Sequence, residues 1–395
     1  MNIVMVPFHD YKKWLFEGFR TRDAHLCQHF EKNDAVEKIL VVNRPTSKAE
    51  KILKKTDWKT PSDNVVYCKN NVQLSKMSRK VWCIDFYIPD FLKVACQKKM
   101  WWFTAFGYEN VIREINNAIE YLDMKDSVLL LQNPMAIGTA KGVNKKLFVF
   151  DAIDNWLYHP QMSNKTLIRE NYAFADKNAD LILTVSEALK NIFPSNENVH
   201  WIPNGVDVEY FSRAVKKEKP DDKPVIGYIG KIQDRVDFDL VEKCLCRYPN
   251  AQFEFLGPIY SQAKRIAQLE KKYSNISFKG DIHYSKLPDS MKHFDISIIP
   301  HKVDDFTSSM NPLKLYEYLA AGKMVVTTSV AGTENISSYV YSANDDAFVE
   351  NIGKALSDIQ NDSVHVQDII ESIPKECFWE RRVTDILSLF IKQMD

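Results

Sequence analysis

Short apolar runs alternate with longer amphipathic stretches along the whole chain, and this alternation is the feature that most restricts the possible folds. Near-continuous runs of Val, Ile and Leu separated by helical patterns are typical of parallel sheets whose two faces are covered by helices. A helix is predicted over residues 14–30, soon after the first run. The runs of the first half are 1–8, 39–42, 65–68, 128–131, 147–150, 181–185 and 200–203.

The pattern starts again at Pro224, so the 395 residues are predicted to form two domains. We expect an N-terminal domain over residues 1–212, a polar linker over 213–223 and a second domain over 224–377. Residues 378–395 are predicted to form an amphipathic helix that crosses back to the first domain. The runs of the second half are 225–230, 253–257, 276–280, 295–300 and 324–328.

The composition is that of a globular protein, with 45% hydrophobic and 26% charged residues. The 52 basic and 52 acidic side chains cancel, which argues against a nucleic acid as the main partner. The seven cysteines lack the spacing of a zinc site, and we interpret them as reduced thiols. The chain shows neither a signal-peptide pattern nor a membrane-spanning apolar run. We therefore expect a cytoplasmic protein that can contact the inner face of the membrane.

The most informative stretch is 308–328, SSMNPLKLYEYLAAGKMVVTT. Pro312 suits the first position of a helix over 313–321, with Asn311 as its N-cap, and Gly322 suits the residue after its end. A helix that begins directly after a strand and a loop presents free N–H groups and a positive dipole end. The stretch therefore predicts a site for a diphosphate.

Glu317 lies about one turn into this helix, between two tyrosines and otherwise apolar residues. A lone carboxylate is costly to bury without a polar partner, and ribose hydroxyls would supply one. A capping or surface role for the glutamate is the alternative that the residues alone leave open.

The stretch resembles the donor-binding helix of retaining GT-B glycosyltransferases of family 4, and above all those of the teichuronic-acid-biosynthesis type. The similarity is continuous from about residue 147 to the end. It implies a GT-B fold, in which two Rossmann-like, doubly wound parallel-sheet domains face a central cleft. The other matching pieces, in order, are LTVSEAL at 183–189, NGVD at 204–207, GYIGKIQDRVDFDL at 227–240, NISFKGDIHYSKLP at 275–288, FDISIIPH at 294–301 and FWERR at 378–382.

The resemblance assigns roles in donor binding. Glu317 is implied to bind ribose, and Lys231 and Arg235 to hold the diphosphate together with the backbone N–H groups of Leu313 and Lys314. Fixed cations suit this task because the leaving nucleoside diphosphate gains negative charge as the glycosidic bond breaks.

Three further positions matter for the donor. Asp281 and Ile282 are implied to lie along the base, mostly through backbone contacts. Ser309 stands where the family often has a second glutamate that contacts the donor sugar, so the identity of that sugar stays open. Arg235 follows Lys231 by four residues where the commoner spacing is five, so its role is less secure.

Candidate catalytic residues follow the predicted strand 147–150. Asp151 and Asp154 come at its carboxyl end, where the resemblance implies that one of them replaces a histidine that touches the donor sugar. An Asx cap of the next turn is the alternative. A metal site at DAID is disfavoured, because cations and a helix N-terminus already neutralise the diphosphate. His159 lies nearby in the sequence and is a further candidate.

Two other regions of the first domain are candidates for contacts outside the donor site. His9 follows the first strand, where the resemblance implies a loop that approaches the phosphates and the acceptor. Arg22 opens or lines the next helix and is expected to face the cleft. Residues 75–103 mix lysines and arginines with aromatic residues, a composition that suits contact with lipid headgroups. Core aromatics among solvated lysines are the alternative interpretation of that stretch.

The resemblance thus implies an enzyme that moves a hexose from a nucleotide sugar, with UDP favoured, to a glycan or lipid-linked acceptor with retention. No metal and no cofactor besides the donor is expected. A nucleotide-sugar epimerase and a non-catalytic nucleotide-sugar-binding or scaffold subunit are the alternatives. A dehydrogenase is disfavoured because no GxGxxG follows the first strand.

Overall fold

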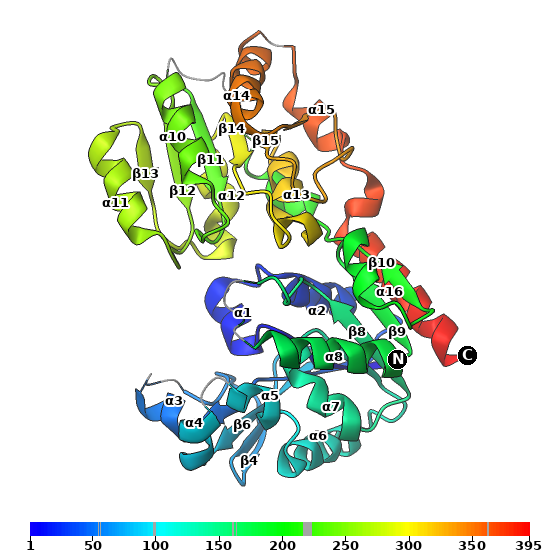
Figure 1. Cartoon of the computed structure of the whole chain (residues 1–395). Coiled ribbons are helices and arrows are strands. Elements are labelled where there is room, and N and C mark those ends of the chain that lie inside the picture. The colour runs from blue at the N-terminus through cyan, green and yellow to red at the C-terminus, as the bar shows by residue number, and fades with distance from the viewer. Residues whose placement is uncertain are drawn as a thin grey trace. The chain divides into compact units, whose positions relative to one another are not determined.

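The computed structural model describes residues 1–53, 55, 57–97, 100–159, 162, 164–215, 223–361 and 363–395. The chain divides into two compact units. The first contains Met1–Ile202 and Val383–Asp395, and the second contains Pro203–Arg382. Both are α/β units with a central sheet (Figure 1). No helix among the described residues is long and apolar enough to cross a membrane.

The first unit is built on a ten-stranded sheet. Its strand order is β10-β9-β8-β7-β1-β2-β6-β5-β4, and β3 pairs with β6 off this path. The parallel strands are β1 (Asn2–Val6), β2 (Lys38–Val42), β3 (Thr46–Ser47), β6 (Val81–Ile88), β7 (Val128–Leu131), β8 (Leu147–Ala152), β9 (Leu181–Thr184) and β10 (Val199–Trp201).

One edge of this otherwise parallel sheet is antiparallel, a feature that the predicted parallel sheet did not include. β4 (Val65–Lys69) and β5 (Val72–Lys76) form a hairpin, and β5 is also antiparallel to β6. The hairpin turns at Asn70 and Asn71, whose φ values of 52° and 64° both lie in the left-handed region. Asparagine tolerates that region and two such residues give the primed turn that suits a hairpin. The predicted strand-like runs included neither β5 nor β6.

The predicted helix 14–30 is wrong, because two helices stand in its place. α1 (Tyr11–Glu17) ends at Gly18, and α2 (Arg22–Lys32) begins after Thr21. Gly18 and Phe19 have φ values of 84° and 65°, so the backbone leaves the right-handed helical region between α1 and α2. The other helices of the unit are α3 (Lys48–Leu53), α4 (Leu92–Gln97), α5 (Trp101–Ala105), α6 (Glu109–Tyr121), α7 (Ile137–Gly142) and α8 (Lys165–Asn178).

The basic and aromatic stretch 75–103 is not one continuous surface. Phe86 on β6 and Trp101 on α5 are buried in the core of the unit, which agrees with the alternative interpretation for these two residues. Phe91 and Leu92 are exposed by 50% and 76%. Lys98 and Lys99 lie outside the described residues.

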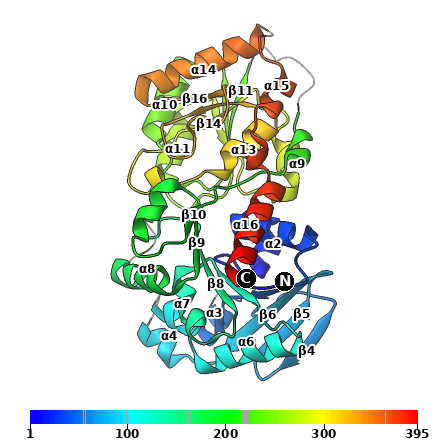
Figure 2. The same ribbon diagram turned by 90° about the vertical axis from the view of Figure 1, so that its right-hand side faces the viewer.

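The second unit has a six-stranded, fully parallel sheet in the order β13-β12-β11-β14-β15-β16. α10 and α14 pack together (Figures 1 and 2). α9 packs on α13 (Figure 2) and on α12. The strands are β11 (Val225–Ile229), β12 (Gln252–Leu256), β13 (Ile276–Phe278), β14 (Ile296–Ile299), β15 (Met324–Thr327) and β16 (Val340–Ser342). The helices are α9 (Val208–Ser212), α10 (Phe238–Arg247), α11 (Ala263–Lys272), α12 (Leu287–Met291), α13 (Leu313–Ala320), α14 (Asp345–Gln360) and α15 (Val366–Glu371).

The unit boundary differs from the predicted linker at 213–223. Residues from Pro203 onward, including α9, already belong to the second unit because α9 packs on α13. Residues 216–222 of that linker lie outside the described residues. The last helix, α16 (Trp379–Met394), starts in the second unit, and from Val383 onward its residues belong to the first.

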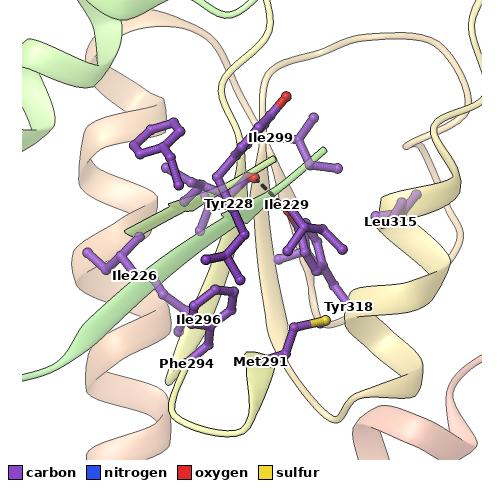
Figure 3. Packing of buried hydrophobic residues seen from close by; sticks show 14 of the residues in the cluster. Ile226, Tyr228, Ile229, Met291, Phe294, Ile296, Ile299, Leu315 and Tyr318 are labelled. Carbon is purple, nitrogen blue, oxygen red and sulfur yellow. Dashed lines mark hydrogen bonds between the residues drawn. The ribbon is translucent and has the colours of Figure 1, made fainter. Parts of the chain in front are cut away.

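The core of the second unit surrounds β11 and β14 (Figure 3). Gly227 on β11 leaves room for the ring of Phe294, since a Cβ at this position would come within 2.0 Å of a ring carbon. At the last residue of β11, the Ile229 backbone N–H donates to the Tyr318 hydroxyl at 2.7 Å. This bond fixes α13 against the carboxyl end of β11, next to Gly230.

Candidate functional site

The start of α13 has N–H groups that no side chain of the described residues caps. Pro312 is the N-cap residue, so the prediction of Asn311 in that position is wrong. The helix follows β14 and a short 3₁₀ turn, Thr307–Ser309, and it ends before Gly322, whose φ is 68°. Uncapped N–H groups at the positive end of a helix favour an anion.

Asn311 instead ties this helix start to the NGVD segment. Its Oδ1 accepts the Asn204 backbone N–H at 2.8 Å, and its backbone carbonyl accepts Asn204 Nδ2 at 2.6 Å. Its own Nδ2 donates to the Tyr316 hydroxyl at 2.9 Å. Asn311 is therefore a structural bridge, and the backbone that leads into α13 is held in one position.

Several cationic side chains lie near the start of α13. The Lys314 ammonium is buried and donates to the Tyr228 hydroxyl at 2.8 Å. Arg235 is half-buried, and its neighbour Val236 forms an isolated bridge with His301. Lys231 follows Gly230 directly after β11, and its ammonium lies 6.0 Å from the centre of the Tyr260 ring.

Burial and mutual repulsion shape the electrostatics of this group. Burial, followed by the Arg235 cation, lowers the pKa of Lys314 well below its ordinary value. Burial and the two cations Lys314 and Arg235 lower the pKa of His301 in the same way. An anion bound here would relieve this repulsion, because each cation would gain an opposite charge at short range.

Glu317 lies on the same helix, one turn beyond Lys314, and is only 6% exposed. Its Oε1 accepts a hydrogen bond from the Tyr284 hydroxyl at 2.9 Å. The Tyr284 ring stacks on Tyr210 at 5.5 Å with an interplanar angle of 9°. Burial, and then the Glu317 carboxylate, raise the pKa of Tyr284 well above its ordinary value, so the phenol stays a donor. The carboxylate is thus held in place, as a group that positions a ligand must be.

The remaining donor-side candidates surround this helix. The Ser309 hydroxyl is buried and donates to the Phe306 carbonyl at 3.0 Å within the 3₁₀ turn. Asp281 is exposed and Ile282 half-buried, in the loop that leads to Tyr284. Leu313 is half-buried at the first position of α13.

In the first unit, Asp151 and Arg22 form a buried ion pair. Arg22 Nε and Nη2 donate to the two carboxylate oxygens at 3.0 and 3.1 Å, and Gln132 Nε2 adds a third bond at 2.8 Å. Asp151 is fully buried, and Arg22 is 4% exposed. These contacts favour a positioning role for Asp151, while Asp154 remains more open to solvent.

The other first-unit candidates gather in an aromatic cluster at the carboxyl ends of β1 and β8. Phe8 stacks on Trp156 at 4.1 Å, and the His159 ring lies 4.9 Å from the Trp156 ring. The His9 ring lies 4.9 Å from Phe8, and the His9 backbone N–H donates to Asp23 at 2.8 Å. His9 and His159, 150 positions apart in the sequence, are therefore linked through the stacked rings of Phe8 and Trp156.

Comparison with known proteins shows which family the second unit resembles. Residues 223–358, which include Lys231, Arg235 and all of α13, match the family model described as glycosyl transferases group 1. This family match lies within the second unit. TuaH of Bacillus subtilis (strain 168), named as a teichuronic acid biosynthesis glycosyltransferase, is 32% identical over 163 residues. This match covers 39% of the chain and 41% of TuaH, less than half of either protein.

Solved structures extend the likeness to both units. The sucrose-phosphate synthase (tll1590) of Thermosynechococcus elongatus superposes with a TM-score of 0.67 at 13% identity, over 99% of this chain and 98% of that one. Anabaena Alr3699/HepE in complex with UDP gives 0.66 at 12% identity, over 99% and 100%. At such identities the likeness shows the fold alone, and it confirms the predicted GT-B fold of two Rossmann-like units.

Both units contain candidate functional residues that were not among the predicted site residues. Tyr228 and His301 hold Lys314, Tyr284 holds Glu317, and Gln132 holds Asp151. Each is a neutral side chain within or just after a strand-like run or in a loop, so its sequence position alone gave no signal. Among the described residues, no group of three or more His, Cys, Asp or Glu side chains is placed to hold a metal ion.

Proposed function

We propose that the protein is a retaining hexosyltransferase that takes a sugar from a nucleotide-sugar donor and transfers it to a glycan or lipid-linked acceptor. The observation that carries this proposal is the composition of α13. One helix presents uncapped N–H groups, the Lys314 cation and the buried Glu317 carboxylate, in an order that suits a diphosphate followed by a ribose.

The donor half supplies charge stabilisation to the leaving group. The nucleoside diphosphate gains negative charge as the bond to the anomeric carbon breaks, and fixed cations and helix N–H groups lower the energy of that charge. Lys231 and Arg235 are proposed to hold the diphosphate with the backbone N–H groups of Leu313 and Lys314. Glu317 then binds the ribose, and the loop at Asp281 and Ile282 lies along the base.

UDP is the favoured nucleotide. HepE, which shares the fold, is described in complex with UDP, and the name of TuaH points to synthesis of a cell-surface polysaccharide. For the chemistry, we propose that the donor diphosphate itself helps to deprotonate the acceptor on the face from which it leaves, which gives retention. Asp154, His159 and His9 are the proposed contacts of the donor sugar and the acceptor.

A panel of UDP, GDP, ADP and CMP tests the donor site by thermal unfolding. A ligand at about 100 times its dissociation constant stabilises a protein by about 2.7 kcal/mol, which raises the melting temperature measurably. We expect UDP to stabilise the protein and a UDP-hexose to be consumed when an acceptor is present. Stabilisation without turnover across many acceptors would favour a non-catalytic binding subunit. Epimerised donor without any acceptor would favour an epimerase, and no stabilisation by any nucleotide would refute the donor site.

A lipid-linked acceptor would place the enzyme at the cytoplasmic face of a membrane, and the exposed part of residues 75–103 is a proposed contact. Phe91 and Leu92 are exposed next to Lys93, which pairs with Asp90 at 3.6 Å, and the two apolar side chains suit insertion at headgroup level. We expect the double change of Phe91 and Leu92 to serine to reduce co-sedimentation with anionic vesicles at low salt. Tyr121→Ser, at a tyrosine that is 63% exposed on α6, is the control. Equal binding of both variants and the wild type would exclude this surface.

A further inference from the structure

The side chain of Lys314 turns from the first turn of α13 into the interior of the second unit. Its ammonium lies 2.8 Å from the Tyr228 hydroxyl, 3.4 Å from His301 Nε2 and 4.0 Å from the centre of the Tyr228 ring. Tyr228 and His301 are exposed by 0% and 1%. A lysine held in this way loses little conformational entropy when it binds a ligand, unlike a lysine on the surface.

The partners of this ammonium are neutral groups. Burial raises the pKa of Tyr228 to about 12, and burial with the nearby cations keeps His301 neutral by lowering its pKa. Arg235 repels the ammonium, while the Glu317 carboxylate, one turn along α13, attracts it. A buried cation whose hydrogen-bond partners are neutral is stabilised when an anion arrives beside it.

The position of the ammonium points to where that anion would bind. A Cβ at Gly230 would lie 2.9 Å from Lys314 Nζ, so the ammonium lies against the turn that follows β11. Ligands of open parallel sheets bind at the carboxyl ends of strands, which is where this turn lies. Two buried polar atoms near it, Arg235 Nε and His301 Nδ1, have no hydrogen-bond partner among the described residues.

We propose that the Lys314 side chain is a third cation of the diphosphate site, fixed in advance by Tyr228 and His301. This inference rests on the proposed function and deepens it. It assigns to Lys314 a direct phosphate contact through its ammonium, in addition to its backbone N–H. The phosphate charge of the donor would then be bound by the buried Lys314 cation as well as by the more accessible Lys231 and Arg235.

Binding of UDP, inorganic pyrophosphate and uridine to Lys314→Met tests the inference by calorimetry. We expect UDP and pyrophosphate to bind about 10- to 100-fold more weakly, the loss of one hydrogen bond to a charged group, while uridine binding changes less than about twofold. Lys323→Met is the matched control, because Lys323 is also buried and lies just after the other end of α13. That variant should bind all three ligands as the wild type does.

Tyr228→Phe gives a second measurement that keeps the lysine. It removes the hydroxyl that orients the ammonium and should weaken pyrophosphate binding about threefold, again without an effect on uridine. Unchanged UDP affinity in Lys314→Met, or an equal loss of UDP and uridine, would overturn the inference. If Lys231→Met weakens UDP and Lys314→Met does not, the proposed donor site stands and only the role of Lys314 fails. A wild type that binds neither UDP nor pyrophosphate refutes both.

Discussion

Replacing Glu317 with alanine is expected to remove most of the stabilisation that UDP gives to the protein. A carboxylate that accepts two ribose hydroxyls makes charge-assisted bonds worth about 1.5 kcal/mol or more each, so affinity should fall by about 100-fold or more. The change also removes the acceptor of the Tyr284 hydroxyl, which is buried. The measurement is the dissociation constant of UDP by calorimetry, with the melting temperature of the unliganded variant as a folding check.

A ligand lacking the ribose hydroxyls separates the two roles of Glu317. The 2′,3′-dideoxy analogue of UDP should bind the wild type about as weakly as UDP binds Glu317→Ala, and combining both changes should add little further loss. Inorganic pyrophosphate should bind Glu317→Ala nearly as well as the wild type. Glu350→Ala, at an exposed glutamate of α14, is the control for the loss of one negative charge from the unit. Full additivity of the two changes would show that Glu317 does not contact the ribose.

Five of the six strands of the second unit, all except β16, could be predicted from the sequence because their signals are local. The strand-like runs are short and apolar, and Gly322 ends α13 at a left-handed φ that favours glycine. The family resemblance lies in the same region, which is where the group 1 model matches. The N-cap of α13 was predicted at Asn311, one residue before the observed N-cap, Pro312. The Asn311 side chain accepts a bond from Asn204, 107 positions away, and does not cap its own helix.

The first unit was harder to predict because its edge depends on pairing between strands. Asp85 interrupts the apolar run of β6, yet its carboxylate is buried and accepts bonds from Asn43 and Thr60. A buried acid with such partners looks like a solvent-exposed residue in the sequence alone, so the strand was not recognised. The partners come from residues 25 and 42 positions away, and no local rule contains them.

The candidate site shows the same limit. The resemblance identified Glu317, Lys231 and Arg235. The neutral residues that hold Glu317 and Lys314 in place, however, come from distant segments. Tyr284 is 33 positions from Glu317, and Tyr228 is 86 positions from Lys314. Which way a lysine side chain turns on a helix is decided by tertiary packing, and so the interior position of Lys314 could not be inferred from its place in the motif.

Replacing Arg22 with methionine is expected to have the largest effect on the stability of the first unit. The change leaves Asp151 buried with only the Gln132 amide as a partner among the contacts described, and removing one member of a buried ion pair typically costs about 3–5 kcal/mol. The measurement is the free energy of unfolding in a denaturant titration that resolves the two units. Arg169→Met is the control, because Arg169 is exposed on α8 and such changes usually stay within about 0.5 kcal/mol.

The partner variant, Asp151→Asn, decides between a structural and a catalytic role for this carboxylate. Asparagine would turn an amide N–H₂ group toward the Arg22 guanidinium, so we expect a loss of stability of similar size to that of Arg22→Met. The double variant Arg22→Met/Asp151→Leu removes both charges and should recover part of that loss, because no unpaired charge is then left buried. A catalytic role would give the opposite pattern: Asp151→Asn would keep the wild-type free energy of unfolding and lose turnover by a large factor. In that case Asp151, and not Asp154, would be the residue that touches the donor sugar.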